Sequence, residues 1–380
     1  MKLTQAAGLC DAVQQNFDCG NALLKEYAPS KQGDRNSCYL WSYFANTGML
    51  YHAHKAGIPV LPLYQTLVDG FAFYRSQPFG DGLVKYHSER GDAAGGGHGP
   101  CFFDDNIWVA RNFLFAYEVF DNLEYLDEAR RITAYTYTGW NEEIGGLVWN
   151  ENGLTGQGTA QELERGLSAN ACCILVNALL YRLTGEESYL SWACRFYDFC
   201  KTAQDPVTKI YYNGIHTLLQ NGRRVPGEVN HDLYSYNPGS MVLADLMMYE
   251  VAGERSFYED ALAAADAAHH AFLRVDDVTG LSYYHDFVWF LAILAEAYHA
   301  LAVYAPQAVR PYMAVFENML QHALAKGTMC NGLLPHDYLT GWRTGNDDYD
   351  RMLLTHSGTA EIALLLCMLS TNSSNDGILI

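Results

Sequence analysis

The stretch Gly185-Glu186-Glu187-Ser188-Tyr189-Leu190-Ser191-Trp192-Ala193 recurs in outline along the chain and decides its fold. In each copy a turn is followed by acidic residues and then by the apolar face of a helix, as at 122–129 and 253–261. Acidic residues in the first turn are favoured by the helix dipole. The tyrosines that open these helices lie 54 to 69 residues apart, at Tyr64, Tyr125, Tyr189, Tyr258 and Tyr312. That period is the length of a helix pair.

A second set of helices alternates with the tyrosine-led ones and is apolar on nearly every face. We expect these helices at about 37–55, 103–120, 167–183, 235–252, 286–304 and 352–369. A helix that is apolar all round is buried on all sides, whereas the tyrosine-led helices carry more charge and suit an outer layer. The helix at 352–369 pairs with an N-terminal helix at about 4–27. We therefore predict an all-α fold, an (α/α)6 toroid of six helical hairpins, forming one domain over residues 1–380.

Loop lengths indicate where a functional site lies. Connections from inner to outer helices are short, but those from outer to inner helices are long: about 77–102, 139–166, 202–234, 273–285 and 326–351. Short extended segments are expected within these loops. Long loops in a compact domain are commonly functional, so we expect the site on the face where inner helices begin.

Composition and charge exclude several classes of partner. The chain has 24 basic and 43 acidic residues, a net charge of -19 that repels nucleic acid and anionic membranes. No window is expected to span a bilayer, and no signal peptide is visible at the N-terminus. The ten cysteines lack metal-ligand spacing and are interpreted as buried free thiols. We expect a cytoplasmic protein, or a secreted one if a leader was removed, without metal or cofactor.

Asp104 and Asp105 stand where the second inner helix begins, between a glycine-rich segment and Trp108. Two carboxylates in one partly dry site cannot both ionise easily, so one tends to become an acid and the other a base or nucleophile. Such a pair performs glycoside hydrolysis. Two alternatives stay open: an aspartate can cap the helix, and Glu162 and Glu164, before the third inner helix, can supply carboxylates instead.

Polar and aromatic residues on the same face are candidates for binding substrate. Asn and Asp at helix starts can hydrogen-bond sugar hydroxyls or cap the helix, and aromatic rings can stack on sugars or pack against other helices. The candidates are Trp41, Trp108, Asn170, Tyr236, Asn237, Asp286, Trp289, Trp342 and Asp348.

The chain resembles glycoside hydrolase family 76, the α-1,6-mannanases, in several phrases: 103–108, 139–141, 145–149, 168–171, 182–185 and 236–239. The specific part is Phe103-Asp104-Asp105-Asn106-Ile107-Trp108. The resemblance implies a retaining hydrolase of α-1,6-mannosidic linkages in α-mannan or α-mannooligosaccharides. It also implies that Asp104 is the nucleophile and Asp105 the general acid/base. The family often has Gln where this chain has Pro238, and the missing leader favours imported oligosaccharides as substrate.

Two other functions remain as alternatives. Sugar epimerases and isomerases also use α/α toroids, and His231, His285 or His356 would then transfer protons. A toroid that binds glycans without cleaving them is the third possibility. Mannooligosaccharides of increasing length separate the three by cleavage, isomerisation or binding alone.

Overall fold

The computed structural model describes residues 1–80, 82–155, 158–327, 331–335 and 351–371. The described chain is mainly helical and divides into two compact units. Unit 1 combines residues 1–71 with the chain from Ala268 onward, and unit 2 runs from Ala72 to Ala267. The expectation of one domain stays a prediction.

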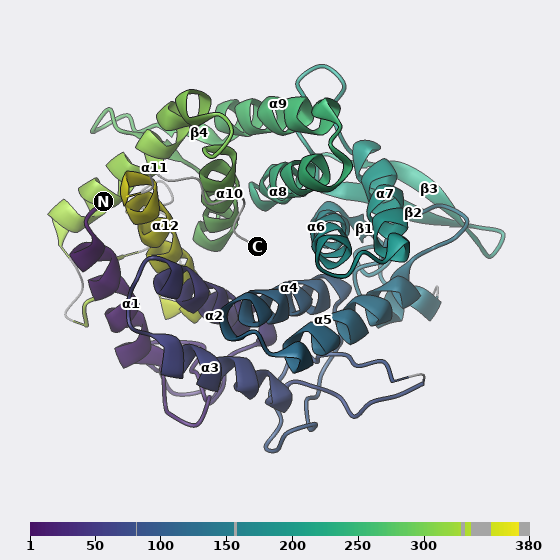
Figure 1. The fold of residues 1–380 in the computed structure, drawn as a ribbon, viewed down its shortest axis with the longest axis horizontal. Coiled ribbons are helices and arrows are strands. Elements are labelled where there is room, and N and C mark those ends of the chain that lie inside the picture. The colour runs from purple at the N-terminus through teal and green to yellow at the C-terminus, as the bar shows by residue number, and fades with distance from the viewer. Residues whose placement is uncertain (81, 156–157, 328–330, 336–350, 372–380) are drawn as a thin grey trace. The chain divides into compact units, whose positions relative to one another are not determined.

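Unit 2 contains three inner helices, each followed after a short turn by its outer helix. Helix α6 packs between α4 and α8, α5 packs on α4, and α7 packs on α6 (Figure 1). The elements are α4 (Phe103–Phe120), α5 (Leu123–Thr136), α6 (Leu167–Thr184), α7 (Glu187–Lys201), α8 (Tyr236–Ala252) and α9 (Arg255–Phe272), whose last turn belongs to unit 1. The predicted inner helices at 103–120, 167–183 and 235–252 are confirmed to within a residue.

Unit 1 repeats this arrangement with the two ends of the chain. Helix α12 packs against α10, α2 and α1, which confirms the expected pairing of the first and last helices. The elements are α1 (Leu3–Phe17), α2 (Leu40–Lys55), α3 (Leu61–Gly70), α10 (Val288–Leu301), α11 (Pro306–Lys326) and α12 (Leu353–Thr371). The predicted N-terminal helix at 4–27 is wrong in its length. It ends at Phe17 because Gly20, Asn21 and Ala22 all take positive φ angles.

The long loops contain the expected extended segments and one hairpin that the sequence analysis missed. Strands β1 (Arg165–Gly166), β2 (Gly214–Gln220) and β3 (Arg223–Asn230) form an antiparallel sheet, and β4 (Leu273–Val275) pairs with β5 (Ser282–Tyr284). Isolated bridges such as Trp140 to Leu147 order other loops. Short 3-10 turns occur at Phe71–Phe73, Tyr137–Gly139 and Glu151–Thr155.

Helix α6 corrects one expectation from composition. By length and composition it is apolar enough to cross a membrane, although the sequence analysis found no such window. Within the described part of the chain, 72% of its apolar window is buried inside the structure. A core helix with neighbours on all sides has this composition.

The cysteines partly match the sequence expectation. Those in the described ranges are all free, and most are buried. Cys194, which was expected to be buried, is exposed on α7 because it lies on the outer side of an outer helix.

Candidate functional site

Asp104 and Asp105 are the second and third residues of α4, and neither is its N-cap. Phe102 takes the N-cap position, and its side chain makes no capping hydrogen bond. The alternative that an aspartate of the pair caps this helix is therefore wrong. Both carboxylates lie in the first turn, where free peptide N–H groups and the helix dipole stabilise negative charge.

The two carboxylates have different hydrogen-bond environments. The indole Nε1 of Trp149 donates to Asp104 Oδ2 at 3.0 Å, and the backbone N–H of Asp105 donates to Asp104 Oδ1 at 2.9 Å. Within the described residues, no donor is found for the carboxylate of Asp105. Donors that bind a carboxylate favour its ionised form, so the structure favours a charge on Asp104.

Burial raises the pKa of both aspartates, and the charge of Asp104 raises that of Asp105 further. Burial raises the pKa of Asp104 to about 6, although its hydrogen bonds with Asp105 and Trp149 lower it. Burial, followed by the charge of Asp104, raises the pKa of Asp105 well above its ordinary value. Both side chains keep part of their surface exposed to solvent. The hydrogen bonds therefore favour the ionised form of Asp104, whereas burial and the charge of Asp104 favour the protonated form of Asp105.

Asn106, the next residue of α4, attaches this turn to the loop before it. Its Oδ1 accepts from the backbone N–H of Tyr86 at 2.7 Å, and its Nδ2 donates to the carbonyl oxygens of Tyr86 at 3.0 Å and Phe102 at 2.7 Å. The side chain is fully buried. The Asn106 amide thus pairs with the backbone of Tyr86 as a neighbouring strand would, and it holds this segment against the start of α4.

Asn170 makes the same contacts at the start of α6. Its Oδ1 accepts from the N–H of Leu147 at 2.9 Å, and its Nδ2 donates to the carbonyl of Gly166 at 2.7 Å. Asn170 was predicted to be a cap or a sugar ligand, but Gly166 is the N-cap, and backbone groups occupy both polar ends of the buried amide. The shared position, fourth in each helix, is the signal that identifies Asn106 as well.

Trp149 lies on an extended segment that pairs with the residues before the aspartates. Its carbonyl accepts from the N–H of Phe103 at 2.9 Å, and Asn150 forms an antiparallel bridge with Phe102. The rings of Phe102 and Trp149 lie 4.8 Å apart between centroids. In the sequence Trp149 is visible only as part of a loop segment, and its contact with Asp104 was not predicted.

Two ion pairs hold the surrounding loops. Lys85 Nζ contacts both oxygens of Glu151 at 2.8 Å. Arg75 forms a two-point pair with Glu128 at 2.5 and 3.0 Å, and the hydroxyl of Tyr86 donates to the same glutamate at 2.7 Å. These contacts join the loop before α4 to the 3-10 turn that begins at Glu151 and to α5.

Glu164 joins a polar cluster that includes two predicted site residues. Its Oε1 accepts from Asn213 at 3.2 Å and from Asn230 at 2.7 Å. Asn213 Oδ1 in turn accepts from the hydroxyl of Tyr236 at 3.1 Å and from Asn237 Nδ2 at 3.2 Å. The structure thus brings Glu164, Tyr236 and Asn237 together through Asn213, which the sequence analysis did not single out.

Glu162, the other alternative carboxylate, orders its own loop. It accepts from Asn152 Nδ2 at 2.7 Å, from the N–H of Thr159 at 2.8 Å and from Asn150 Nδ2 at 3.3 Å. These bonds, led by that from Asn152, lower the pKa of Glu162 to about 2. A carboxylate with so low a pKa is a poor general acid near neutral pH.

The remaining predicted substrate residues differ in exposure. Trp108 is 5% exposed and lies beside the guanidinium of Arg111, and Trp289 is 8% exposed and packs against Phe44, so packing accounts for most of both rings. Asp286 accepts from the N–H of Phe287, just before α10. Trp41, on α2, is half-buried. Trp342 and Asp348 lie outside the described residues.

The histidines of the epimerase alternative occupy separate settings. His231, in unit 2, is exposed and lies edge-on to Tyr212 with ring centroids 4.4 Å apart. In unit 1, His285 is exposed, whereas His356 is buried beside Phe17.

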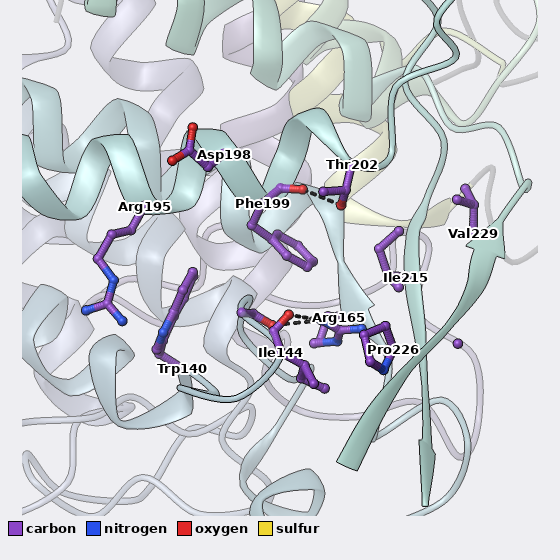
Figure 2. Close-up of a pocket in the computed structure, with 12 residues that line it drawn as sticks. Trp140, Ile144, Arg165, Arg195, Asp198, Phe199, Thr202, Ile215, Pro226 and Val229 are labelled. Carbon is purple, nitrogen blue, oxygen red and sulfur yellow. Dashed lines mark hydrogen bonds between the residues drawn. The ribbon is translucent and has the colours of Figure 1, made fainter.

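Unit 2 also has a cavity of about 590 Å³ beside α7, β2 and β3. Figure 2 shows the ring of Phe199 directed toward Ile144 and Arg165, with Ile215, Pro226 and Val229 along one side. Arg165 donates to the carbonyls of Ile144 and Gly145, both at 2.8 Å. The lining of this cavity is mainly apolar. Among the described residues it includes one carboxylate, from Asp198, so the cavity does not offer the paired acids that glycoside hydrolysis needs.

Solved structures match this fold over nearly the whole chain. The glycoside hydrolase family 76 mannosidase Bt3792 from Bacteroides thetaiotaomicron VPI-5482 has a TM-score of 0.78 at 19% identity, covering 98% of this chain and 99% of that one. An inactive variant of the α-1,6-mannanase GH76A of Salegentibacter sp. HEL1_6, in complex with α-1,6-mannotriose, has a TM-score of 0.72 at 17% identity, covering 97% and 99%. An unsaturated glucuronyl hydrolase specific for heparin has a TM-score of 0.65 at 14% identity, covering 97% and 96%. These matches confirm the predicted α/α toroid.

The match to a sequence family is more specific than the match in fold. No curated protein matches it by sequence. The model of glycosyl hydrolase family 76 matches residues 81–373, which include the aspartate pair, Asn106 and Trp149. A match over most of the chain favours hydrolysis over the epimerase and the glycan-binding alternatives. The chain belongs to glycosyl hydrolase family 76, and the protein is a glycoside hydrolase.

Proposed function

We propose that this glycoside hydrolase cleaves α-1,6-mannosidic linkages in α-mannan or α-mannooligosaccharides with retention of configuration. Asp104 is the nucleophile, and Asp105 is the general acid/base. The observation that carries the proposal is the unequal environment of the two aspartates in the first turn of α4: two donors bind Asp104, whereas burial and the charge of Asp104 raise the pKa of Asp105.

The structural neighbours support the choice of substrate and of catalytic pair. The inactive Salegentibacter mannanase that holds α-1,6-mannotriose carries asparagines in place of two neighbouring aspartates. A variant with two alanines there is also inactive and is in complex with α-1,6-mannotetrose. This chain has neighbouring aspartates in the same family of enzymes.

The proposed reaction needs two steps. Asp104 attacks the anomeric carbon as its bond to the glycosidic oxygen breaks, and the proton of Asp105 passes to that oxygen. The ionised Asp105 then takes a proton from water, whose oxygen attacks the anomeric carbon and releases Asp104. Each cycle consumes one water and returns the proton to Asp105.

Product analysis tests the substrate and the stereochemistry together. The protein is incubated with α-1,6-mannobiose, mannotriose and longer oligomers, and the first-formed product is followed by proton NMR. We expect cleavage with the α-anomer appearing first. The β-anomer would exclude Asp104 as nucleophile, and a failure to cleave any of these oligomers would refute the substrate.

Aspartate variants test the division of roles. Asp104→Ala should lower kcat by about four orders of magnitude or more. Asp105→Ala should lower it by about 10²- to 10⁴-fold on natural substrates, but much less on an aryl mannoside whose leaving group needs no proton. Asp198→Ala is the matched control. It removes an exposed carboxylate at the cavity beside α7, β2 and β3, and this variant should cleave substrate at the wild-type rate. If either Asp104→Ala or Asp105→Ala keeps near wild-type activity while folded, the assignment is wrong.

A further inference from the structure

Asp104 differs from Asp105 in having two hydrogen-bond donors, of which one is the indole of Trp149. The backbone donor from Asp105 belongs to the helix itself, but the indole donor comes from a loop 45 residues further along the chain. Burial raises the pKa of both carboxyls, and two coupled acids in such a site share their proton between them. The two donors on Asp104, one of them the indole N–H, therefore favour the charge on Asp104.

The backbone fixes the place of this donor. The carbonyl of Trp149 accepts from the N–H of Phe103, the residue directly before Asp104. The bridge between Phe102 and Asn150 continues the pairing on the other side. The indole is also packed against the ring of Phe102 at 4.8 Å between centroids. The donor and the carboxylate are thus attached to the same short piece of paired backbone, which leaves the side chains little freedom to separate.

Trp149 is half-buried, so part of its ring is exposed to solvent beside the pair. Two roles fit a partly exposed tryptophan at this place: a surface on which a sugar ring stacks, or a donor that orients a carboxylate. A 3.0 Å hydrogen bond to Asp104 Oδ2 supports the second role. Each carboxylate oxygen has a second lone pair, so Asp104 can accept this bond and still attack.

We propose that Trp149 is a positioning residue for Asp104: its indole N–H orients the carboxylate and makes Asp104, rather than Asp105, the ionised member of the pair. The inference rests on the proposed function, in which Asp104 is the nucleophile. Removing the N–H leaves Asp104 with its backbone donor alone, which raises the pKa of Asp104 toward that of Asp105. A larger fraction of the enzyme then has its nucleophile protonated.

The test compares Trp149→Phe with wild type in kcat, KM and the pH dependence of kcat/KM on α-1,6-mannooligosaccharides. We expect the acidic limb to move up by about one pH unit, because a hydrogen bond to a charged group has about that effect on a pKa. We also expect kcat to fall about tenfold or more, with KM changed little. Replacing Trp149 by 3-benzothienylalanine keeps the bicyclic shape and substitutes sulfur for the N–H, so it should reproduce the shift if loss of volume is not the cause.

Trp140→Phe is the matched control. It makes the same substitution at a tryptophan that lines the cavity beside α7, so it should leave the acidic limb in place. An unmoved acidic limb in both Trp149 variants would overturn the proposal, and a rise in KM alone would assign Trp149 to sugar stacking instead. Failure of the proposed function gives a different result, because wild type would then leave the oligosaccharides intact or Asp104→Ala would remain active.

Discussion

At the scale of single residues, Asn106 shows how a buried amide places a catalytic turn. It satisfies both backbone polar groups of Tyr86 while it also donates to the carbonyl of Phe102. Asn170 satisfies Leu147 and Gly166 in the same way on α6. Both residues therefore attach a loop to the start of an inner helix, but only Asn106 directly follows the aspartates.

This equivalence gives a paired prediction. Asn106→Ala and Asn170→Ala should each lower the free energy of unfolding by about 2–4 kcal/mol, because each leaves buried backbone groups without a partner. Asn106→Ala should also lower kcat/KM, whereas Asn170→Ala should change it little. Urea unfolding and steady-state kinetics on the same preparations measure both effects. Equal losses of activity in the two variants would argue against a specific role of Asn106 in placing the pair.

At the scale of elements, the loop segment that carries Trp149 depends on a turn at Gly146 whose backbone favours glycine. Gly146 has a φ of +80°, and a Cβ at this position would lie 2.6 Å from the ring of the buried Phe199. Gly222, in the turn between β2 and β3, has a φ of +76° but open space around it. Both positions favour glycine, but only Gly146 is also packed.

Replacing each of these two glycines by alanine should therefore destabilise the protein to different extents. Gly222→Ala should destabilise by about 1 kcal/mol from backbone strain alone. Gly146→Ala adds a clash with Phe199 and should cost about 2–4 kcal/mol, with a fall in kcat because the segment of Trp149 shifts. Thermal unfolding and initial rates check both. If the two variants lose the same stability, the contact with Phe199 is not limiting.

The missed hairpin belongs to this scale as well. Asn221 and Gly222 both take positive φ, the backbone of a tight hairpin turn, and Asn-Gly between extended residues is its usual sequence signal. Helical periodicity predicted only a long connection at 202–234, without this hairpin. The Asn221-Gly222 pair is a local signal for a hairpin turn, so the hairpin could have been predicted from the sequence.

At the scale of the whole molecule, the core of unit 1 contains a buried charged group that joins three helices. His52 of α2 lies 3.6 Å from Glu296 of α10 and 3.2 Å from Glu361 of α12. Burial by itself lowers the pKa of His52, but its ion-pair contacts with Glu296 and Glu361 outweigh it and raise the pKa to about 9. A protonated His52 thus links the inner helices of the unit.

The pH dependence of stability follows from this shift. Because the folded pKa is above the unfolded value of about 6.5, the stabilisation by His52 is full below pH 6.5 and is lost as pH rises through about 9. His52→Gln should therefore cost up to about 3 kcal/mol more near pH 6 than above pH 9. His54→Gln, the same substitution at a half-exposed position of the same helix, is the control. An equal cost of His52→Gln at both pH values would contradict the assignment of charge to His52.

The sequence by itself determined the alternation of inner and outer helices and the location of Asp104 and Asp105, because the period of apolar residues and the lengths of loops are local properties of the chain. The tertiary structure decided which polar groups meet. Trp149 reaches Asp104, Asn170 is occupied by backbone, and Glu164 contacts Asn213, through pairings between segments tens of residues apart. An isolated Asn or Trp in a sequence carries no record of its partner, since a hydrogen bond depends on distance and direction that only the folded chain sets.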